Sequence, residues 1–145
     1  MMARIKLTLP EHKIFSAEIA VRITDINYGN HVGNDSFVSM LHEARMMWLT
    51  SLNYSELNIE NTSLIMADLA LEYKAESFYG DLLAIDISIG EISRVSFEIY
   101  YKISTVRNGE NILIAQAKTG MVCYDYEAKK VTSISSTFEK IINNK

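Results

Sequence analysis

The sequence has few of the proline and glycine residues that are typical of linkers between domains. Its 145 residues include one proline and six glycines, and no segment is repeated or low in complexity. Linkers between domains are usually rich in such residues, so nothing divides the chain. With 48% apolar residues, it can bury a core without disulfide or metal crosslinks. We therefore expect a single domain over residues 1–145.

Cysteine and concentrated charge are also scarce. The single cysteine, Cys123, excludes an internal disulfide and is typical of a structural thiol in a reducing compartment. The net charge of −4 comes from interspersed acids and bases, without the block of Lys and Arg that binds nucleic acid or an anionic membrane. We expect neither partner.

Long hydrophobic runs are missing as well. No apolar stretch approaches the length that spans a bilayer, and residues 1–10 lack the sustained hydrophobic region of a secretory signal. Cytoplasmic localisation is the expectation. His12 and His42 have no ligand spacing, and the chain has too few Cys and His for a zinc cluster, so we expect neither a metal nor another cofactor.

One strong helical pattern begins at Asn34. Apolar residues recur there at spacings of three and four, which predicts an amphipathic helix. We expect Asn34 to be the N-cap, Asp35 to place negative charge in the first turn, and Asn53 to lie near the end. The apolar positions are Phe37, Met40, Leu41, Ala44, Trp48 and Leu52.

Five segments have the composition of strands, rich in β-branched and aromatic residues. They are residues 13–24, 63–74, 82–92, 95–105 and 112–126, and the last two are joined by a loop with Asn108 and Gly109. Residues 135–143 fit either a further strand or a short helix. We expect an α+β fold in which an antiparallel sheet wraps around one long helix. Its exposed sheet edges favour a dimer.

The segment before the helix is the strongest candidate for a site. The backbone N–H groups and the dipole at a helix start can stabilise a developing oxyanion, and glycines let a substrate approach the backbone. An Asn- and Gly-rich turn that only caps the helix is the alternative, and both interpretations stay open at this point. The segment contains Asp25, Asn27, Gly29, His31, Gly33 and Asn34.

The same segment resembles the hotdog-fold thioesterases of the 4-hydroxybenzoyl-CoA and acyl-CoA thioesterase superfamily. Their first loop and helix often contain D-x-D-x-x-G-H-V-N-N, then an aromatic residue and E-A-R. This chain has DINYGNHVGN at residues 25–34, then Phe37 and HEAR at residues 42–45. Residues 65–73 and the later Gly80 and Asp81 resemble the family's second strand and its Gly-Asp turn, so the likeness extends over residues 13–125.

The resemblance implies a hotdog fold, a homodimer or homotetramer, and an active site at the subunit interface. The substrate would be an acyl-CoA or an acyl carrier protein, with the acyl group beside the central helix. The residues that the resemblance would place against the substrate are Tyr28, Gly29, Val32, Gly33, Asn34 and Asp68.

The chain departs from the family pattern at Asn27, which stands where many relatives have a catalytic aspartate. An amide can orient water or a carbonyl but cannot accept a proton usefully. His31 is the natural base by its intrinsic pKa, although a loop histidine is often structural. Asp25 is a second candidate, either as a base or as the group that fixes the His31 tautomer, although a turn acceptor is the simpler interpretation.

Two further carboxylates leave alternatives open. Glu43, beside Arg45, either forms an ion pair that holds the helix or supplies the carboxylate that attacks the thioester or activates water. Asp68 either faces the site across a dimer or lies in solvent on an alternating strand.

The sequence therefore predicts hydrolysis of an acyl thioester, with Asp25, Asn27, His31 and Glu43 as the catalytic candidates. Backbone N–H groups of residues 32–34 would hold the oxyanion. The rival from another class is a non-hydrolytic acyl-thioester binder that has lost its aspartate. A hotdog dehydratase is less consistent with the sequence, because its paired Asp and His are not found.

Overall fold

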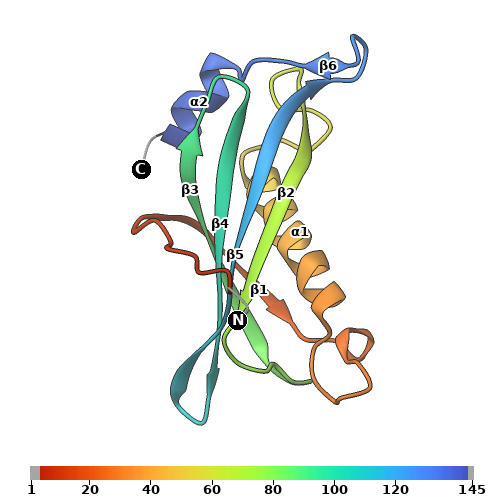
Figure 1. Ribbon diagram of the computed structural model, residues 1–145, viewed down its shortest axis with the longest axis vertical. Coiled ribbons are helices and arrows are strands. Elements are labelled where there is room, and N and C mark those ends of the chain that lie inside the picture. Colours follow the sequence, from red (N-terminus) through yellow and green to blue (C-terminus); the bar gives the residue numbers. More distant parts are fainter. Residues whose placement is uncertain (1–3, 144–145) are drawn as a thin grey trace.

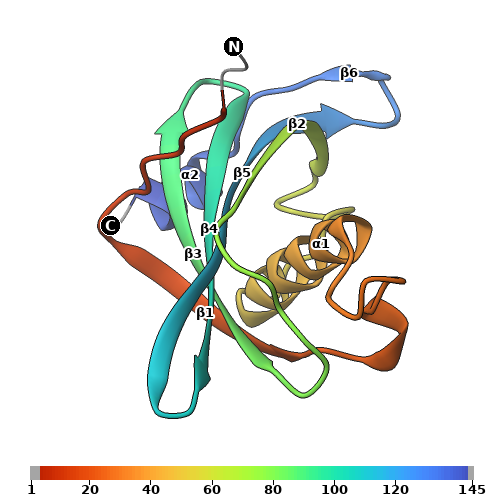
Figure 2. The same ribbon diagram turned by 60° about the horizontal axis from the view of Figure 1, so that its bottom comes forward.

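The computed structural model describes residues 4–143 and contains a curved antiparallel sheet with one long helix on its concave side (Figure 1). The turned view in Figure 2 shows the sheet curling around helix α1. The elements are β1 (Lys13–Ala20), the 3-10 turn η1 (Ile23–Asp25), α1 (Asn34–Ser51), β2 (Ser63–Tyr73), β3 (Leu82–Ile92), β4 (Ser96–Arg107), β5 (Glu110–Asp125), β6 (Lys130–Val131) and α2 (Ser136–Asn143).

The strand order across the sheet is β1-β3-β4-β5-β2, and every pairing is antiparallel. The short strand β6 pairs with the end of β5 and was not predicted. Asn108 and Gly109 both have positive φ, 52° and 79°, as the tight hairpin between β4 and β5 requires. The predicted α+β architecture, with an antiparallel sheet around one long helix, is confirmed.

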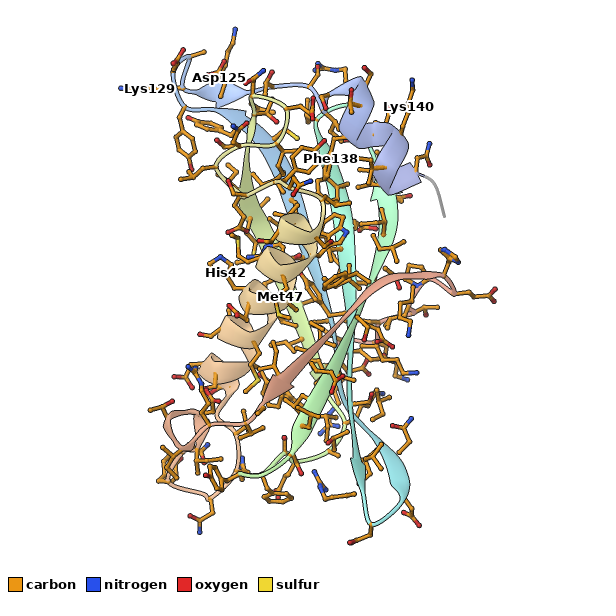
Figure 3. The ribbon with its side chains drawn as sticks, turned by 180° about the vertical axis from the view of Figure 1, so that it is seen from behind. His42, Met47, Asp125, Lys129, Phe138 and Lys140 are labelled. Carbon is orange, nitrogen blue, oxygen red and sulfur yellow. The ribbon has the colours of Figure 1, made fainter. Side chains whose placement is uncertain are left out.

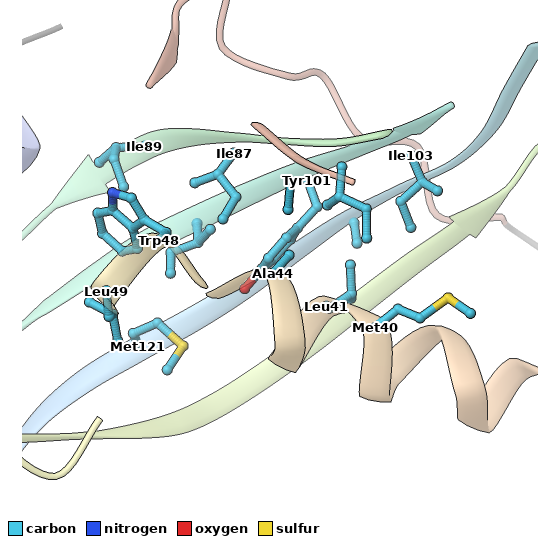
Figure 4. Packing of buried hydrophobic residues seen from close by; sticks show 14 of the residues in the cluster. Met40, Leu41, Ala44, Trp48, Leu49, Ile87, Ile89, Tyr101, Ile103 and Met121 are labelled. Atoms are coloured by element: carbon cyan, nitrogen blue, oxygen red, sulfur yellow. The ribbon is translucent and has the colours of Figure 1, made fainter. Parts of the chain in front are cut away.

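The core lies between α1 and the concave face of the sheet (Figure 4). Alternate residues of the central strands point inward because successive side chains of a strand face opposite sides. Leu83, Ile85 and Ile87 of β3 are fully buried in this way. From α1, the predicted apolar positions Leu41, Ala44 and Trp48 pack against them, together with the buried charged residue Arg45.

The helix starts one residue earlier than its predicted cap implied. Gly33, not Asn34, is the N-cap, and its carbonyl accepts the N–H groups of Ser36 and Phe37 at 3.1 and 3.3 Å. No side chain forms a hydrogen bond at this cap. Asp35 lies in the first turn as expected, where its charge complements the helix dipole. Asn53 follows the end of the helix with a φ of 64°.

The predicted first strand is too long, and the ambiguous C-terminus is a helix. Strand β1 ends at Ala20 rather than Thr24, because the chain turns into η1 and the Asp25 carboxylate accepts the Arg22 N–H at 2.8 Å. In α2, Phe138 is buried, with its ring centroid 6.1 Å from that of Trp48 and 5.5 Å from that of Phe97. Figure 3 shows Phe138 pointing from α2 toward the interior.

The outer side of α1 is exposed and mostly polar. His42 and Met47 lie on this side of the helix (Figure 3). Within residues 4–143, neither helix combines the length and the apolar character needed to cross a membrane.

Candidate active site

A cleft of about 480 Å³ opens at the N-terminal end of α1. One side is the loop before the helix together with the first helical turn. The other side is the last residue of β2 and the segment that follows it, which we call the cleft wall and which comprises residues 73–77. The cleft is lined by Asn27, His31, Val32, Asn34, Phe37, Tyr73, Lys74, Ala75, Glu76 and Ser77.

The loop folds so that the side chains of Asn27 and His31 lie next to each other. The Asn27 N–H donates to the His31 carbonyl at 2.9 Å, and Asn27 Oδ1 accepts the Gly29 N–H at 2.9 Å. A Cβ atom on Gly29 would lie 3.0 Å from His31 Nε2 and 3.3 Å from Asn27 Oδ1. Glycine at position 29 therefore lets the imidazole and the amide approach the same backbone.

The hydrogen bond of His31 defines its tautomer. Its Nδ1 atom lies 3.2 Å from the Val32 carbonyl oxygen. A carbonyl can only accept, so the proton of the neutral imidazole is on Nδ1 and the lone pair is on Nε2. The basic nitrogen is therefore the one beside Asn27 and Gly29.

The free donors at the helix start differ from those expected at residues 32–34. The Val32 N–H donates to the Ser77 carbonyl at 2.8 Å, and the Gly33 N–H donates to the Asp25 carbonyl at 3.0 Å. Neither is available to an oxyanion. Among the described residues, no acceptor binds the N–H groups of Asn34 and Asp35, which the start of a helix leaves unpaired. Of these two residues only Asn34 lines the cleft, so its N–H is the donor that the helix start offers there.

Asp25 is buried but is not joined to His31. Its carboxylate oxygens bind Arg22, through the backbone N–H at 2.8 Å and the guanidinium at 3.4 and 3.5 Å. Together with Glu43, it lines a second depression between β1 and α1. The structure thus separates Asp25 and Glu43 from the cleft that holds Asn27 and His31.

The remaining predicted residues lie outside the cleft lining. Tyr28 is fully exposed at the tip of the loop, and Gly29 and Gly33 shape the loop backbone. Glu43 is exposed and forms no ion pair within residues 4–143. Asp68 lies on β2, where Lys118 binds its carboxylate at 3.0 Å and lowers its pKa.

The sequence did not single out the cleft wall. Tyr73 contacts Phe37 edge-to-face in the cleft lining, with ring centroids 5.6 Å apart and an interplanar angle of 62°. Burial raises the pKa of Tyr73. The wall residues lie at and after the end of β2 and carry no recognisable motif, so only their contact with the loop identifies them. Within residues 4–143, no group of three metal-ligating side chains is close enough together to hold an ion.

Residues 21–142 match the family model of the thioesterase-like superfamily. The chain belongs to this superfamily. A thioesterase-like relative, the 1,4-dihydroxy-2-naphthoyl-CoA hydrolase of Synechocystis sp., is 27% identical over 131 residues, which cover 88% of this chain and 94% of that protein. The predicted family is therefore confirmed.

Solved thioesterase structures share the fold. The crystal structure of a 1,4-dihydroxy-2-naphthoyl-CoA thioesterase from Synechocystis superposes with a TM-score of 0.79 at 26% identity, over 90% of this chain and 96% of that chain. A 4-hydroxybenzoyl-CoA thioesterase mutant in complex with 4-hydroxybenzoyl-CoA gives a TM-score of 0.77 at 15% identity, over 88% and 97%. The second likeness supports the hotdog fold alone.

Proposed function

We propose that this thioesterase-like protein hydrolyses acyl-CoA thioesters in the cleft at the start of α1. One observation carries the proposal: His31 Nε2, the Asn27 amide and the free N–H of Asn34 belong to residues that line the same cleft. A base, a water-orienting group and an oxyanion donor are the parts that acyl transfer to water requires. The superfamily and the coenzyme A relatives support the reaction type.

The proposed reaction proceeds through a tetrahedral intermediate. His31 Nε2 takes a proton from a water held by the Asn27 amide, and the water oxygen bonds to the thioester carbon. The former carbonyl oxygen becomes the oxyanion that the Asn34 N–H stabilises, aided by the positive end of the helix dipole. The carbon–sulfur bond then breaks, and the His31 imidazolium returns the proton to the departing thiolate. The products are a free acid and coenzyme A.

The buried Asp25 has a supporting part in this proposal. Its carboxylate and its carbonyl hold both ends of the loop, through the N–H groups of Arg22 and Gly33. Glu43 remains the alternative carboxylate. It would contact a substrate, or a group of a partner subunit, that reaches the second depression.

The aromatic pair in the cleft suggests the kind of acyl group. Phe37 is buried, and Tyr73 is half exposed opposite it. A planar aromatic acyl group can stack edge-to-face or offset against such rings, which stabilises it by about 0.5–1.5 kcal/mol beyond area burial. The Synechocystis relative acts on an aromatic naphthoyl thioester. We therefore propose aromatic acyl-CoA substrates.

A panel of thioesters tests the proposal through release of free thiol. The panel contains aromatic acyl-CoAs, straight-chain acyl-CoAs of equal carbon number, and one acyl carrier protein thioester. We expect kcat/KM to be about 10-fold higher for the aromatic acyl-CoAs, and Tyr73→Leu to remove that preference. Absence of thiol release from every member would contradict hydrolysis, and equal values for both acyl classes would contradict only the aromatic preference.

We also propose that the chain forms a homodimer through β2, and that two dimers build any tetramer. Within residues 4–143, strand β2 pairs only with β5, and it exposes Met66 and Leu69, which is unfavourable for an uncovered edge. Tyr73 ends this strand and lines the cleft, so a partner on β2 would lie beside the site.

Light scattering tests this assembly. Wild type should have twice the chain mass, and Leu69→Lys should be monomeric. The matched variant Val106→Lys, at an exposed apolar position at the hairpin end of β4, should remain dimeric. A wild-type monomer at micromolar concentration would contradict the dimer.

A further inference from the structure

Two charged residues outside the cleft lining join the cleft wall to the rest of the molecule. Arg107, at the end of β4, donates through Nε to Asp81 Oδ1 at 3.1 Å and through Nη2 to Asp81 Oδ2 at 2.8 Å. Two parallel charge-assisted hydrogen bonds fix both position and orientation. Asp81 is buried, so solvent screens this pair weakly.

The Asp81 carboxylate also organises the end of the cleft wall and the turn that begins there, residues 76–78. Its Oδ2 atom accepts the Ser77 hydroxyl at 3.1 Å and the Phe78 N–H at 2.9 Å. Arg107 Nη2 adds a hydrogen bond to the Glu76 carbonyl at 3.0 Å, and the guanidinium lies 5.0 Å from the centroid of the Phe78 ring. Residues 76–78 are therefore held by side chains rather than by the sheet.

Residues 76–78 and Asp81 also hold the loop that carries His31. The Ser77 carbonyl accepts the Val32 N–H at 2.8 Å, and Val32 follows His31 directly. The Asp81 carbonyl accepts the Val21 N–H at 3.0 Å, at the point where the chain enters this loop. The chain of contacts runs from Arg107 through Asp81 and Ser77 to Val32.

Backbone hydrogen bonds to the sheet hold the first residues of the cleft wall but not residues 76–78. The N–H groups of Lys74 and Ala75 both donate to the Ile114 carbonyl of β5, at 2.8 and 3.1 Å. These bonds attach the first part of the wall to the sheet. The second part, which contacts the loop, depends on Arg107 and Asp81.

We propose that Arg107 and Asp81 are positioning residues of the active site: they fix the distance between the cleft wall and the loop that carries His31. The inference rests on the proposed function. Neither side chain lines the cleft. Their effect on turnover would be large because a displacement of about 1 Å at a reacting group can lower the rate by about 100-fold.

The test compares Arg107→Gln with Lys102→Gln, which removes an exposed cation from the same strand. We expect Arg107→Gln to lower kcat at least about 10-fold. KM should change less than about threefold, because Phe37 and Tyr73 belong to α1 and β2 and not to the turn. Arg107→Lys should recover part of kcat, since one ammonium keeps the charge but not the paired geometry. Lys102→Gln should retain wild-type values.

Amide hydrogen exchange gives a second readout that a general loss of stability would not reproduce. In Arg107→Gln, exchange of the Val32 amide should accelerate at least about 10-fold, while the core amides of β4 stay protected. A kcat within twofold of wild type, or equal acceleration of Val32 and core amides, would overturn the inference. If wild type shows no turnover, the proposed function fails, and unchanged Val32 exchange in Arg107→Gln would then overturn the positioning role separately.

Discussion

At the scale of single residues, the loop separates candidates that the sequence had grouped. Asp25 and His31 are six positions apart, and the sequence offered Asp25 as a base or as the group that fixes the His31 tautomer. In the fold, Asp25 binds Arg22, while His31 binds the Val32 carbonyl. Spacing in a loop does not fix side-chain direction, because each hydrogen bond depends on local turns such as that at Gly29.

Asn27 distinguishes a hydrolase from a binding protein most clearly, because its amide cannot serve as a base near neutral pH. If His31 is the base, Asn27→Asp should change kcat less than about 10-fold, because a base is already present. Thiol release by both proteins measures this. A negligible wild-type rate that rises by several orders of magnitude in Asn27→Asp would instead identify a binding protein that lost its carboxylate.

At the scale of elements, α1 is joined to the sheet by a buried polar network. Arg45 donates to Glu56 Oε2 at 2.7 Å and to the Tyr101 hydroxyl at 3.0 Å, and the Tyr101 and Thr119 hydroxyls lie 2.8 Å apart. The sequence suggested an ion pair on this helix but placed it at Glu43. The actual partner, Glu56, lies in the loop after the helix, which no periodic pattern describes.

Removing Arg45 should weaken this attachment in a pH-dependent way. Burial alone would raise the pKa of Glu56, but hydrogen bonds from Arg45 and His42 outweigh burial and lower it. A lowered pKa contributes stability above the unfolded value of about 4.3 that is lost as pH falls. Arg45→Met should therefore cost about 2 kcal/mol at pH 7, and the difference from wild type should shrink below about pH 4.

Urea unfolding at several pH values measures that difference. The double variant Arg45→Met/Glu56→Gln is the control, because it removes the unpaired carboxylate and should recover part of the loss. A destabilisation that stays constant down to pH 3 would show that lost packing, not the ion pair, is responsible.

At the scale of the whole molecule, the sequence predicted the architecture better than the site. The strands β2 to β5 lie within a few residues of their predicted bounds, because alternation and hairpin turns are local signals. The cleft is formed by segments that are far apart in the sequence. The cleft wall meets the loop before α1 through tertiary contacts such as that between Val32 and Ser77. Of the predicted site residues, Asn27, His31, Val32 and Asn34 line this cleft.

The whole fold thus brings a basic imidazole to the start of α1, and one comparison tests that arrangement most directly. The turnover of a cleaved acyl-CoA is measured for wild type, His31→Ala and His12→Ala; His12 is exposed and outside the cleft. We predict that His31→Ala lowers kcat by about 100-fold or more without unfolding, while His12→Ala matches wild type. Full activity of a folded His31→Ala protein would contradict the proposed role of His31.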